Sequence, residues 1–463
     1  MTGIVLALYG LIFGSYAAFT WNKFQLTDYG KYVNTVWNCG HGHLFKFLVD
    51  ENYLNTHLSY SLALLGPFFL IWDHPFLLSV LQWMGLIIGG FIFWRTARLR
   101  QVNHSLAAAL VFLYTAYPYT QSVMLSEFHG VAFYYLLVPW LYHGLCFQKR
   151  WVWIPFLITL GLREDAPFIL IPFFLYFAVT DRWKPGYVYA LSALIFGLIG
   201  LGVVFPSLSG VSLMERRPDL GKLASYTQRM GWEGLELRSK ALFWLFLPVL
   251  PFIKKGWIPI LLFPLVGLIQ SMITPYPFQY SLYYHYPASV FTCLFAGIVE
   301  AVSRNTQNKK EVFLKLVFLP LYLFVITVIA HHERGYLWGG KEYSFVYGTM
   351  NQKRDIMVAL TAKIPKEGVL LCSVNLAGLC ANRKDLISWE YWDPEKMTVD
   401  IFFLTFKDVI AYRNRLLPLL RKNEYVLIYQ DERRIILQRG SSDPSQMSGL
   451  IEKITRFGEK ESN

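Results

Sequence analysis

Carboxylates and imidazoles gather in a few short polar stretches of an otherwise apolar sequence. The first stretch, residues 24–58, directly follows the apolar N-terminal segment and contains Asp28, Asp50, Glu51 and His57. A carboxylate within hydrogen-bond reach of a hydroxyl can accept its proton, and a histidine can hold or donate one. This stretch therefore predicts acid–base chemistry close to the first apolar segment.

Three later stretches carry similar side chains between long apolar runs. They add an arginine, whose planar guanidinium can bind a phosphate through two parallel hydrogen bonds. Their polar residues are Glu127 and His129, then Arg163, Glu164 and Asp165, and finally Tyr283, Tyr284 and His285.

The composition is that of a polytopic membrane protein. Of the 463 residues, 54% are hydrophobic and 16% are charged, whereas soluble domains carry about 25% charged residues. The net charge of +12 comes from basic residues in short loops, as the positive-inside rule expects, so we predict no nucleic-acid partner. The N-terminus has neither a basic region nor a small-residue cleavage site, so residues 4–20 are predicted to be a retained first span.

Apolar runs long enough to cross a membrane, about 20 residues each, predict roughly eleven transmembrane helices. Arg95, Arg98 and Arg100 place the end of the second span in the cytoplasm, which puts the N-terminus in the cytoplasm and the C-terminus outside. Helical spacing over residues 29–37 and an apolar run at 57–72 predict interfacial helices in the first exoplasmic loop. The predicted spans are residues 3–20, 75–94, 105–119, 131–147, 151–162, 166–180, 187–205, 241–253, 258–273, 289–302 and 317–330.

The run from 151 to 180 is interrupted at its centre by Arg163, Glu164 and Asp165, followed by Pro167. A single helix here would hold three charges near mid-membrane, each costing about 2.5 to 3.5 kcal/mol. We therefore predict a helical hairpin. Its arms are shorter than the membrane is thick, so the charged turn should lie below the surface and line a water-accessible cavity.

The composition changes after residue 330. Residues 368–374, 400–406, 424–430 and 433–439 have the pattern of strands, and 408–421 that of a helix. The sequence thus predicts a transmembrane domain at 1–330 and a small exoplasmic α/β domain at 331–463. The five cysteines lack metal-ligand spacing. Cys372 and Cys380 could pair if the tail is exported, or remain reduced and buried.

The predicted topology places all four polar stretches on the exoplasmic side. Ionisable residues at membrane depth are costly and often mark functional sites. The structural alternatives are that they cap helix ends at a wet interface or, for Arg163, Glu164 and Asp165, form an ion-pair cluster.

Several of these runs resemble a bacterial family of predicted membrane proteins classed as a domain of unknown function (DUF2079-like). That family is similar in layout to the GT-C glycosyltransferases, which transfer a sugar from a polyprenyl-phosphate carrier at the outer face of the membrane. The chain lacks the recognisable acceptor-domain motifs of better-known GT-C enzymes. The resemblance rests on TDYGKYVNTVWNCGHG, HLSYSLALLGPFFLIW, SEFHGVAF, LREDAPFIL and YHYPASVF, and covers nearly the whole chain.

The resemblance implies a fold, a reaction and a set of residues. Asp28 takes the place of the acidic residue that follows the first span in GT-C enzymes, where it would accept the proton of the acceptor hydroxyl. Arg163 would bind the carrier phosphate. The implied catalytic residues are Asp28, Glu127 and Glu164, and the implied substrate-binding residues are Arg163, His57, His129, Asp165, Tyr284 and His285.

The implied partners are membrane lipid, a polyprenyl-phosphate-linked sugar donor and an unknown acceptor. Whether a metal is required is left open, since Asp28, Glu127 and Glu164 could bind a divalent ion but have no ligand spacing that demands one. The implied location is a bacterial inner membrane, crossed many times.

Two other functions remain open from the sequence. A lipid or solute transporter or flippase would also place charges below the membrane surface, although such proteins often have internal repeats and midplane sites, and neither is clear here. A non-catalytic scaffold would act through the exported tail, so deleting residues 340–463 would abolish its function while Asp28 substitutions would not.

Overall fold

The computed structural model describes residues 11–12, 14, 29–47, 51–211, 232–304, 317–342, 353–389, 392–441 and 444–460. The chain forms two compact units that interleave along the sequence. Unit 1 comprises Met1–Trp21, Leu54–Leu62 and Leu78–Gly348, and unit 2 comprises Asn22–Tyr53, Ala63–Leu77 and Thr349–Asn463. The predicted boundary between a transmembrane domain and an α/β domain at residue 330 stays a prediction. It assigns the whole first polar stretch to the transmembrane domain, whereas residues 22–53 belong to unit 2.

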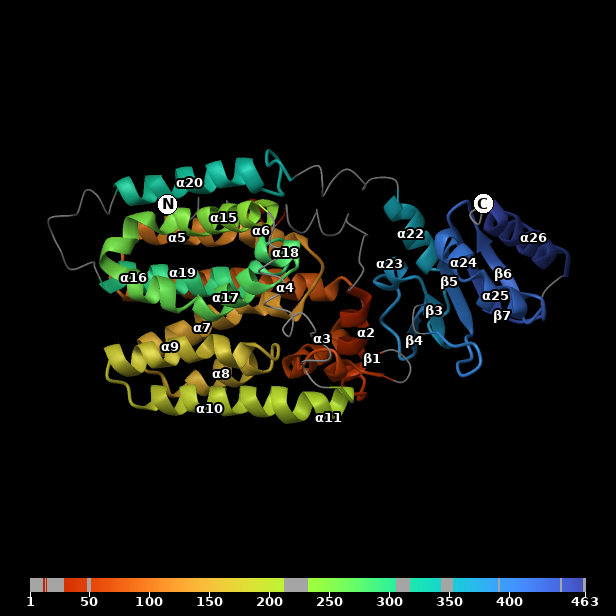
Figure 1. Ribbon diagram of the computed structural model, residues 1–463, viewed down its shortest axis with the longest axis horizontal. Helices are drawn as coiled ribbons and strands as arrows, with labels where there is room; N and C mark the ends of the chain where they lie inside the picture. Colours follow the sequence, from red (N-terminus) through yellow and green to blue (C-terminus); the bar gives the residue numbers. More distant parts are fainter. Residues whose placement is uncertain are drawn as a thin grey trace. The chain divides into compact units, whose positions relative to one another are not determined.

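Unit 1 is helical throughout its described residues. Figure 1 shows its helices as a bundle in which α9 and α10, and likewise α16 and α19, lie alongside each other. The helices are α4 (Leu77–Leu99), α5 (His104–Ala116), α6 (Pro118–Leu125), α7 (Tyr134–Cys146), α8 (Trp153–Leu160), α9 (Ala166–Thr180), α10 (Pro185–Ile199), α11 (Phe205–Ser209), α15 (Trp232–Phe246), α16 (Ile253–Leu262), α17 (Leu265–Ile273), α18 (Pro277–Tyr280), α19 (Pro287–Arg304) and α20 (Leu319–Arg334). Short 3₁₀ turns η2 (Tyr60–Leu65), η3 (Gly130–Phe133), η4 (Arg150–Val152) and η6 (Leu247–Phe252), and the π-helical turn η5 (Gly200–Val204), join them.

Three helices of the described residues are long and apolar enough to cross a membrane: Leu77–Leu99, Pro185–Ser209 and Pro287–Arg304. A fourth candidate is the pair Gly256–Leu262 and Leu265–Ile273, which is bent by 48°. Shorter apolar helices follow the other predicted spans at His104–Ala116, Arg150–Leu160 and Ala166–Thr180. The count of eleven crossings therefore stays a prediction, and nearly all of the predicted span at 3–20 lies outside the described residues.

The predicted break in the run 151–180 is present. Helix α8 ends at Leu160, helix α9 begins at Ala166, and Arg163, Glu164 and Asp165 occupy the turn between them. Pro167 lies in the first turn of α9, where its missing N–H breaks no helical hydrogen bond. The three charged residues thus lie between the two helices, and neither helix contains them.

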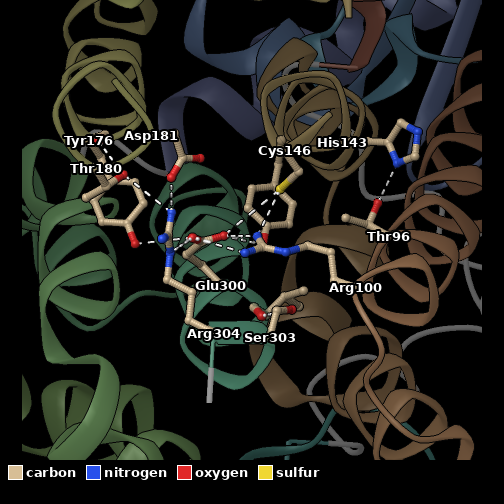
Figure 2. Close-up of polar contacts among 12 residues, drawn as sticks. Thr96, Arg100, His143, Cys146, Tyr176, Thr180, Asp181, Glu300, Ser303 and Arg304 are labelled. Atoms are coloured by element: carbon tan, nitrogen blue, oxygen red, sulfur yellow. Dashed lines mark hydrogen bonds and ion pairs between the residues drawn. The ribbon is translucent and has the colours of Figure 1, made fainter. Parts of the chain in front are cut away.

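A buried carboxylate, Glu300 of α19, connects four helices of unit 1 (Figure 2). Its carboxylate forms ion pairs with Arg100, just after α4, and with Arg304, whose Nε lies 2.5 Å from Oε1. Tyr142 of α7 donates to Oε2 at 2.8 Å and Tyr176 of α9 donates to Oε1 at 3.2 Å. Two cations and two hydroxyls therefore compensate the cost of burying this charge.

Asp181, directly after α9, completes the cluster. Nη2 of Arg304 lies 2.5 Å from its Oδ1, and Figure 2 shows the arginine between the two carboxylates. Two carboxylates and two guanidiniums make the cluster neutral. Both oxygens of the Glu300 carboxylate have hydrogen-bond partners among the described residues. The cluster is therefore a structural tie between the helices.

Unit 2 combines a five-stranded sheet with helices from both ends of the sequence. The sheet order is β4-β3-β5-β7-β6, with β3 parallel to β4 and β5, and with β7 antiparallel to β5 and β6. A second sheet pairs β1 (Lys46–Phe47) with β2 (Glu51–Asn52). The remaining elements are α2 (Tyr29–Gly40), η1 (Tyr53–Asn55), α3 (Gly66–Ile71), α22 (Lys353–Thr361), β3 (Leu370–Cys372), α23 (Val374–Ala377), β4 (Leu386–Ser388), β5 (Ile401–Thr405), α24 (Phe406–Ala411), α25 (Arg413–Leu420), β6 (Tyr425–Gln430), β7 (Arg434–Arg439) and α26 (Pro444–Lys460).

The main core of unit 2 lies between the sheet and the helices α24, α25 and α26. Alternate residues of the strands point into it, as the two-residue period of a strand requires. Phe402 and Leu404 of β5 pack there with Leu416 of α25 and Met447 of α26, all nearly or completely buried. The strands and the C-terminal helices therefore form one hydrophobic core.

Helix α2, from the first polar stretch, belongs to unit 2 because it packs against the segment after β3. The amide of Asn34 donates to the carbonyls of Ala381 and Arg383, at 3.1 and 2.7 Å. A Cβ on Gly30 would lie 2.6 Å from Cβ of Ala377, so only glycine fits this approach without a shift. The predicted helix over 29–37 is thus present and contacts the C-terminal part of the chain.

We predict that Glu300→Ala lowers the free energy of unfolding of unit 1 by about 3 to 5 kcal/mol, because it leaves the largely buried Arg100 without its counterion and removes one of the two carboxylates that bind Arg304. Thermal unfolding in detergent measures the change. The control is Glu236→Ala, which removes an exposed i,i+4 pair with Lys240 and should leave the transition where it is. An equal, small effect of both substitutions would show that the Glu300 cluster is not a structural tie.

We also predict that Gly30→Ala destabilises unit 2, although alanine is the better helix former. The added methyl group would collide with Ala377 and push α2 away from α23. Limited proteolysis should cut the variant faster within unit 2. Gly449→Ala in α26, where a Cβ meets no atom within 4 Å, should cause no loss. Unchanged protection in Gly30→Ala would contradict the close packing of α2.

Candidate functional site

The turn between α8 and α9 is held by η2, which closely follows His57. The backbone N–H of Ser61 donates to the carbonyl of Gly161 at 2.9 Å, and its hydroxyl donates to the carbonyl of Ile158 at 2.5 Å. A Cβ on Gly161 would lie 2.6 Å from Oγ of Ser61, so the approach depends on glycine. This contact brings His57 to the charged turn.

The start of η3 lies against the same turn. A Cβ on Gly130 would meet Cδ2 of Leu62 at 3.2 Å and the carbonyl of Leu162 at 3.9 Å. Beside it, the ring of His129 stacks on the ring of His285, with centroids 3.6 Å apart and planes 19° apart. Parts of four polar stretches, distant in the sequence, therefore meet within unit 1.

Polar contacts and ion pairs join four of these side chains directly. Nδ1 of His57 lies 3.0 Å from Oε1 of Glu164, and Nη2 of Arg163 lies 3.2 Å from Oδ2 of Asp165. Nε of Arg163 lies 3.8 Å from Oε1 of Glu164. The side chains of Arg163, Glu164 and Asp165 are only 13 to 20% exposed, so these pairs are weakly screened by solvent.

Glu164 is ionised in this arrangement. Burial alone would raise the pKa of its carboxyl group, but His57 and then Arg163 lower that pKa to about 2. A carboxylate with so low a pKa is a weak proton acceptor. The arrangement fits a residue that orients His57 and Arg163 better than one that moves a proton itself.

His285, one of the two stacked histidines, is held in its neutral form. Burial, then His129, Arg163 and His57, hold the pKa of its imidazole well below the usual value. The loop that carries it is strained, because Leu282 and Tyr284 have φ angles of 58° and 55°, which non-glycine residues seldom adopt. Such strain is common where a loop presents functional side chains.

Tyr284 and Tyr283 have different surroundings. Burial and the negative charge of Glu127 raise the pKa of the Tyr284 phenol. The hydroxyl of Tyr283 donates to Glu342 at 3.3 Å, and the guanidinium of Arg334 lies 5.0 Å from its ring centroid. Tyr283 therefore anchors the loop through Glu342 and Arg334.

The predicted carboxylates of the first polar stretch are not seen in this site. Asp28 and Asp50 lie outside the described residues, and Glu51 is an exposed residue of β2 in unit 2. The described part of the chain contains no group of three or more His, Cys, Asp or Glu residues that could hold a metal ion. Cys372 and Cys380 are buried in unit 2 and both are free.

The site contains one residue that sequence analysis did not single out. Tyr134, the first residue of α7, is 1% exposed, and the charges of Asp165 and Arg163 act on its hydroxyl. It lies in an aromatic run, AFYYLL, whose composition is that of an ordinary apolar helix. No pattern in the sequence distinguishes it from Tyr135.

We predict that Glu164→Gln removes up to about 3 kcal/mol from the free energy of unfolding at pH 7, from a pKa lowered from 4.5 to about 2. Because the pKa is lowered on folding, this stabilisation is complete above about pH 5 and decreases as the pH falls toward 2. The thermal transitions of wild type and variant should therefore converge between pH 7 and pH 3. Glu452→Gln, at an exposed pair with Arg456, should parallel the wild type. A constant gap across this range would contradict the ion pairing of Glu164.

Comparison with solved structures shows the fold. The chain is similar to the crystal structure of ArnT from Cupriavidus metallidurans in the apo state, a GT-C glycosyltransferase, with a TM-score of 0.55 and 12% sequence identity. The match covers 96% of this chain and 99% of that one. At this identity the likeness establishes the architecture only.

Comparison by sequence gives the family. A search of curated proteins finds no match. Residues 23–408 match the family described as "Predicted membrane protein (DUF2079)". This match includes the charged turn, the stacked histidines and strands β3, β4 and β5 of the five-stranded sheet. Since it spans most of the sequence, the chain belongs to the DUF2079 family of predicted membrane proteins.

Proposed function

We propose that the protein is a membrane glycosyltransferase, which transfers a sugar from a polyprenyl-phosphate carrier to an acceptor hydroxyl on the exoplasmic face of a bacterial inner membrane. The observation that carries the proposal is the meeting of His57, His129, Arg163 and His285 in a helical unit of GT-C architecture. These cationic or hydrogen-bonding groups suit an anionic headgroup presented from a membrane.

Arg163 binds the carrier phosphate in this proposal. Its guanidinium has five donors, and the ion pairs with Glu164 and Asp165 orient it. A fixed guanidinium can bind two phosphate oxygens at once and stabilise the charge that develops on the leaving phosphate. His57, Glu164 and Asp165 hold it in position.

Asp28 accepts the proton of the acceptor hydroxyl. The hydroxyl oxygen attacks the anomeric carbon, the bond from that carbon to the phosphate oxygen breaks, and the phosphate leaves with the electron pair. The resulting products are the glycosylated acceptor and the polyprenyl phosphate. This role for Asp28 rests on its place after the first predicted span, and the catalytic role of Glu127 rests on the family resemblance.

The orientation is also part of the proposal. Eleven crossings, a cytoplasmic N-terminus and an exoplasmic C-terminal domain would put the charged turn and the carrier headgroup on the same side. The basic residues Arg95, Arg98 and Lys149 would then lie on the cytoplasmic side, as the positive-inside rule expects.

We predict that Arg163→Ala lowers sugar transfer at least 100-fold, that Arg163→Lys retains part of it, and that Asp28→Asn abolishes it. Lysine keeps the charge but loses the bidentate geometry. The assay uses the purified protein in proteoliposomes with radiolabelled polyprenyl-phosphoryl sugars and a membrane lipid extract as acceptor. Arg456→Ala, which removes an exposed cation of α26, is the control.

The same vesicles distinguish the competing function. If the label crosses the bilayer still attached to its original lipid, and Arg163→Ala stops this movement, the protein is a flippase and the proposal is wrong. If neither transfer nor movement occurs, and deletion of residues 340–463 alone causes the cellular defect, the scaffold hypothesis replaces it.

A further inference from the structure

Three polar atoms at the candidate site are buried and have no hydrogen-bond partner within the described part of the chain. They are the hydroxyl oxygen of Tyr134, Nδ1 of His285 and Oδ1 of Asp165. A buried polar atom without a partner costs about 1 to 3 kcal/mol, so such atoms are uncommon unless something else binds them.

Tyr134 differs in this respect from the other buried tyrosines around it. Five neighbours on α5, α6 and α7 or the link between them use their hydroxyls. Tyr114 donates to the carbonyl of Tyr135, Tyr117 and Tyr119 donate to carbonyls of α15, Tyr135 accepts from Thr120, and Tyr142 donates to Glu300. The orphaned hydroxyl of Tyr134 is therefore a local exception, at the end of α7 that lies by the charged turn.

The three side chains meet at the charged turn: Asp165 is part of it, His285 stacks on His129, and η3, which directly precedes Tyr134, contacts Leu162 through Gly130. Asp165 and then Arg163 carry the charges that act most strongly on the Tyr134 hydroxyl, and Arg163 is also among the charges that act on His285. Asp165 pairs with Arg163 through Oδ2, which leaves Oδ1 for another donor. One ligand seated beside Arg163 is thus in a position to meet all three.

The hydrogen-bonding properties of these atoms indicate that the ligand has a neutral part and an anionic part. A carboxylate oxygen repels a phosphate but accepts from a hydroxyl, and a phenol can both donate and accept. Tyr134 and Asp165 therefore suit a neutral polyol. Arg163 and a neutral imidazole with a proton on Nδ1 are donors, and they suit a phosphoryl oxygen.

We infer that Tyr134 and Asp165 bind a hydroxyl group of the transferred sugar, while His285 donates from Nδ1 to a phosphoryl oxygen that Arg163 also binds. This inference rests on the proposed function. It makes Tyr134 a specificity-determining residue, which distinguishes the sugar-loaded carrier from the bare polyprenyl phosphate.

The test measures the affinities of two probes in detergent by isothermal titration calorimetry. The probes are polyprenyl phosphate and a panel of polyprenyl-phosphoryl hexoses and pentoses. Tyr134→Phe should weaken binding of the sugar-loaded probe at least about fivefold, the effect of one lost hydrogen bond, and leave the affinity for bare polyprenyl phosphate unchanged. Arg163→Ala should weaken both probes.

Thermal unfolding without ligand provides the second measurement. Tyr134→Phe removes a buried hydroxyl that has no partner, so the variant should be as stable as the wild type or more stable. Tyr135→Phe is the matched control, since its hydroxyl accepts from Thr120 at 3.1 Å. It should lower the transition temperature and leave the preference for the sugar-loaded probe unchanged.

The outcomes separate this inference from the proposed function. If the wild type binds both probes and Arg163→Ala weakens both, but Tyr134→Phe preserves the ratio of the two affinities, the inference is wrong and the donor assignment stands. If the wild type binds neither probe, the donor assignment is wrong and the inference falls with it.

Discussion

An ionised side chain among apolar helices must find opposite charge or hydrogen bonds, and the organisation of unit 1 depends on how two clusters meet this requirement. Around Glu300, two arginines and two tyrosine hydroxyls satisfy a carboxylate that has no exposed surface. Around Arg163, the ion pairs are present, but three buried polar atoms have no hydrogen-bond partner among the described residues. The first arrangement ties helices together, whereas the second keeps hydrogen-bonding capacity for something that is not part of the chain.

The fold explains how residues so distant in the sequence reach one site. Short contacts at Gly161 and Gly130 allow η2 and the start of η3 to approach the turn between α8 and α9. The strained loop with positive φ at Leu282 and Tyr284 then presents His285 to His129. In unit 2, the same first polar stretch supplies α2, which packs on the segment after β3. The first polar stretch therefore contributes residues to both units.

Much of this could be predicted from the sequence, because charge inside an apolar run is a strong signal. The interruption at Arg163 predicted the break between α8 and α9, and the family resemblance and GT-C layout are shown by the comparisons. Glu300 and Tyr134 were missed, because one charge near a helix end and one tyrosine in an aromatic run look ordinary until their neighbours are known. Strand β4 was missed because three residues carry too little periodicity, and the docking of α2 depends on contacts across more than 300 positions of the sequence.

The central claim is that the cluster around Arg163 binds a lipid-linked phosphate, and native mass spectrometry of the protein purified in mild detergent tests it most directly. The account predicts a co-purified polyprenyl phosphate or its sugar conjugate in the wild type and its loss in Arg163→Ala, with the mass of any attached sugar identifying the donor. Absence of such a lipid from both proteins, or its equal retention in both, would contradict the claim.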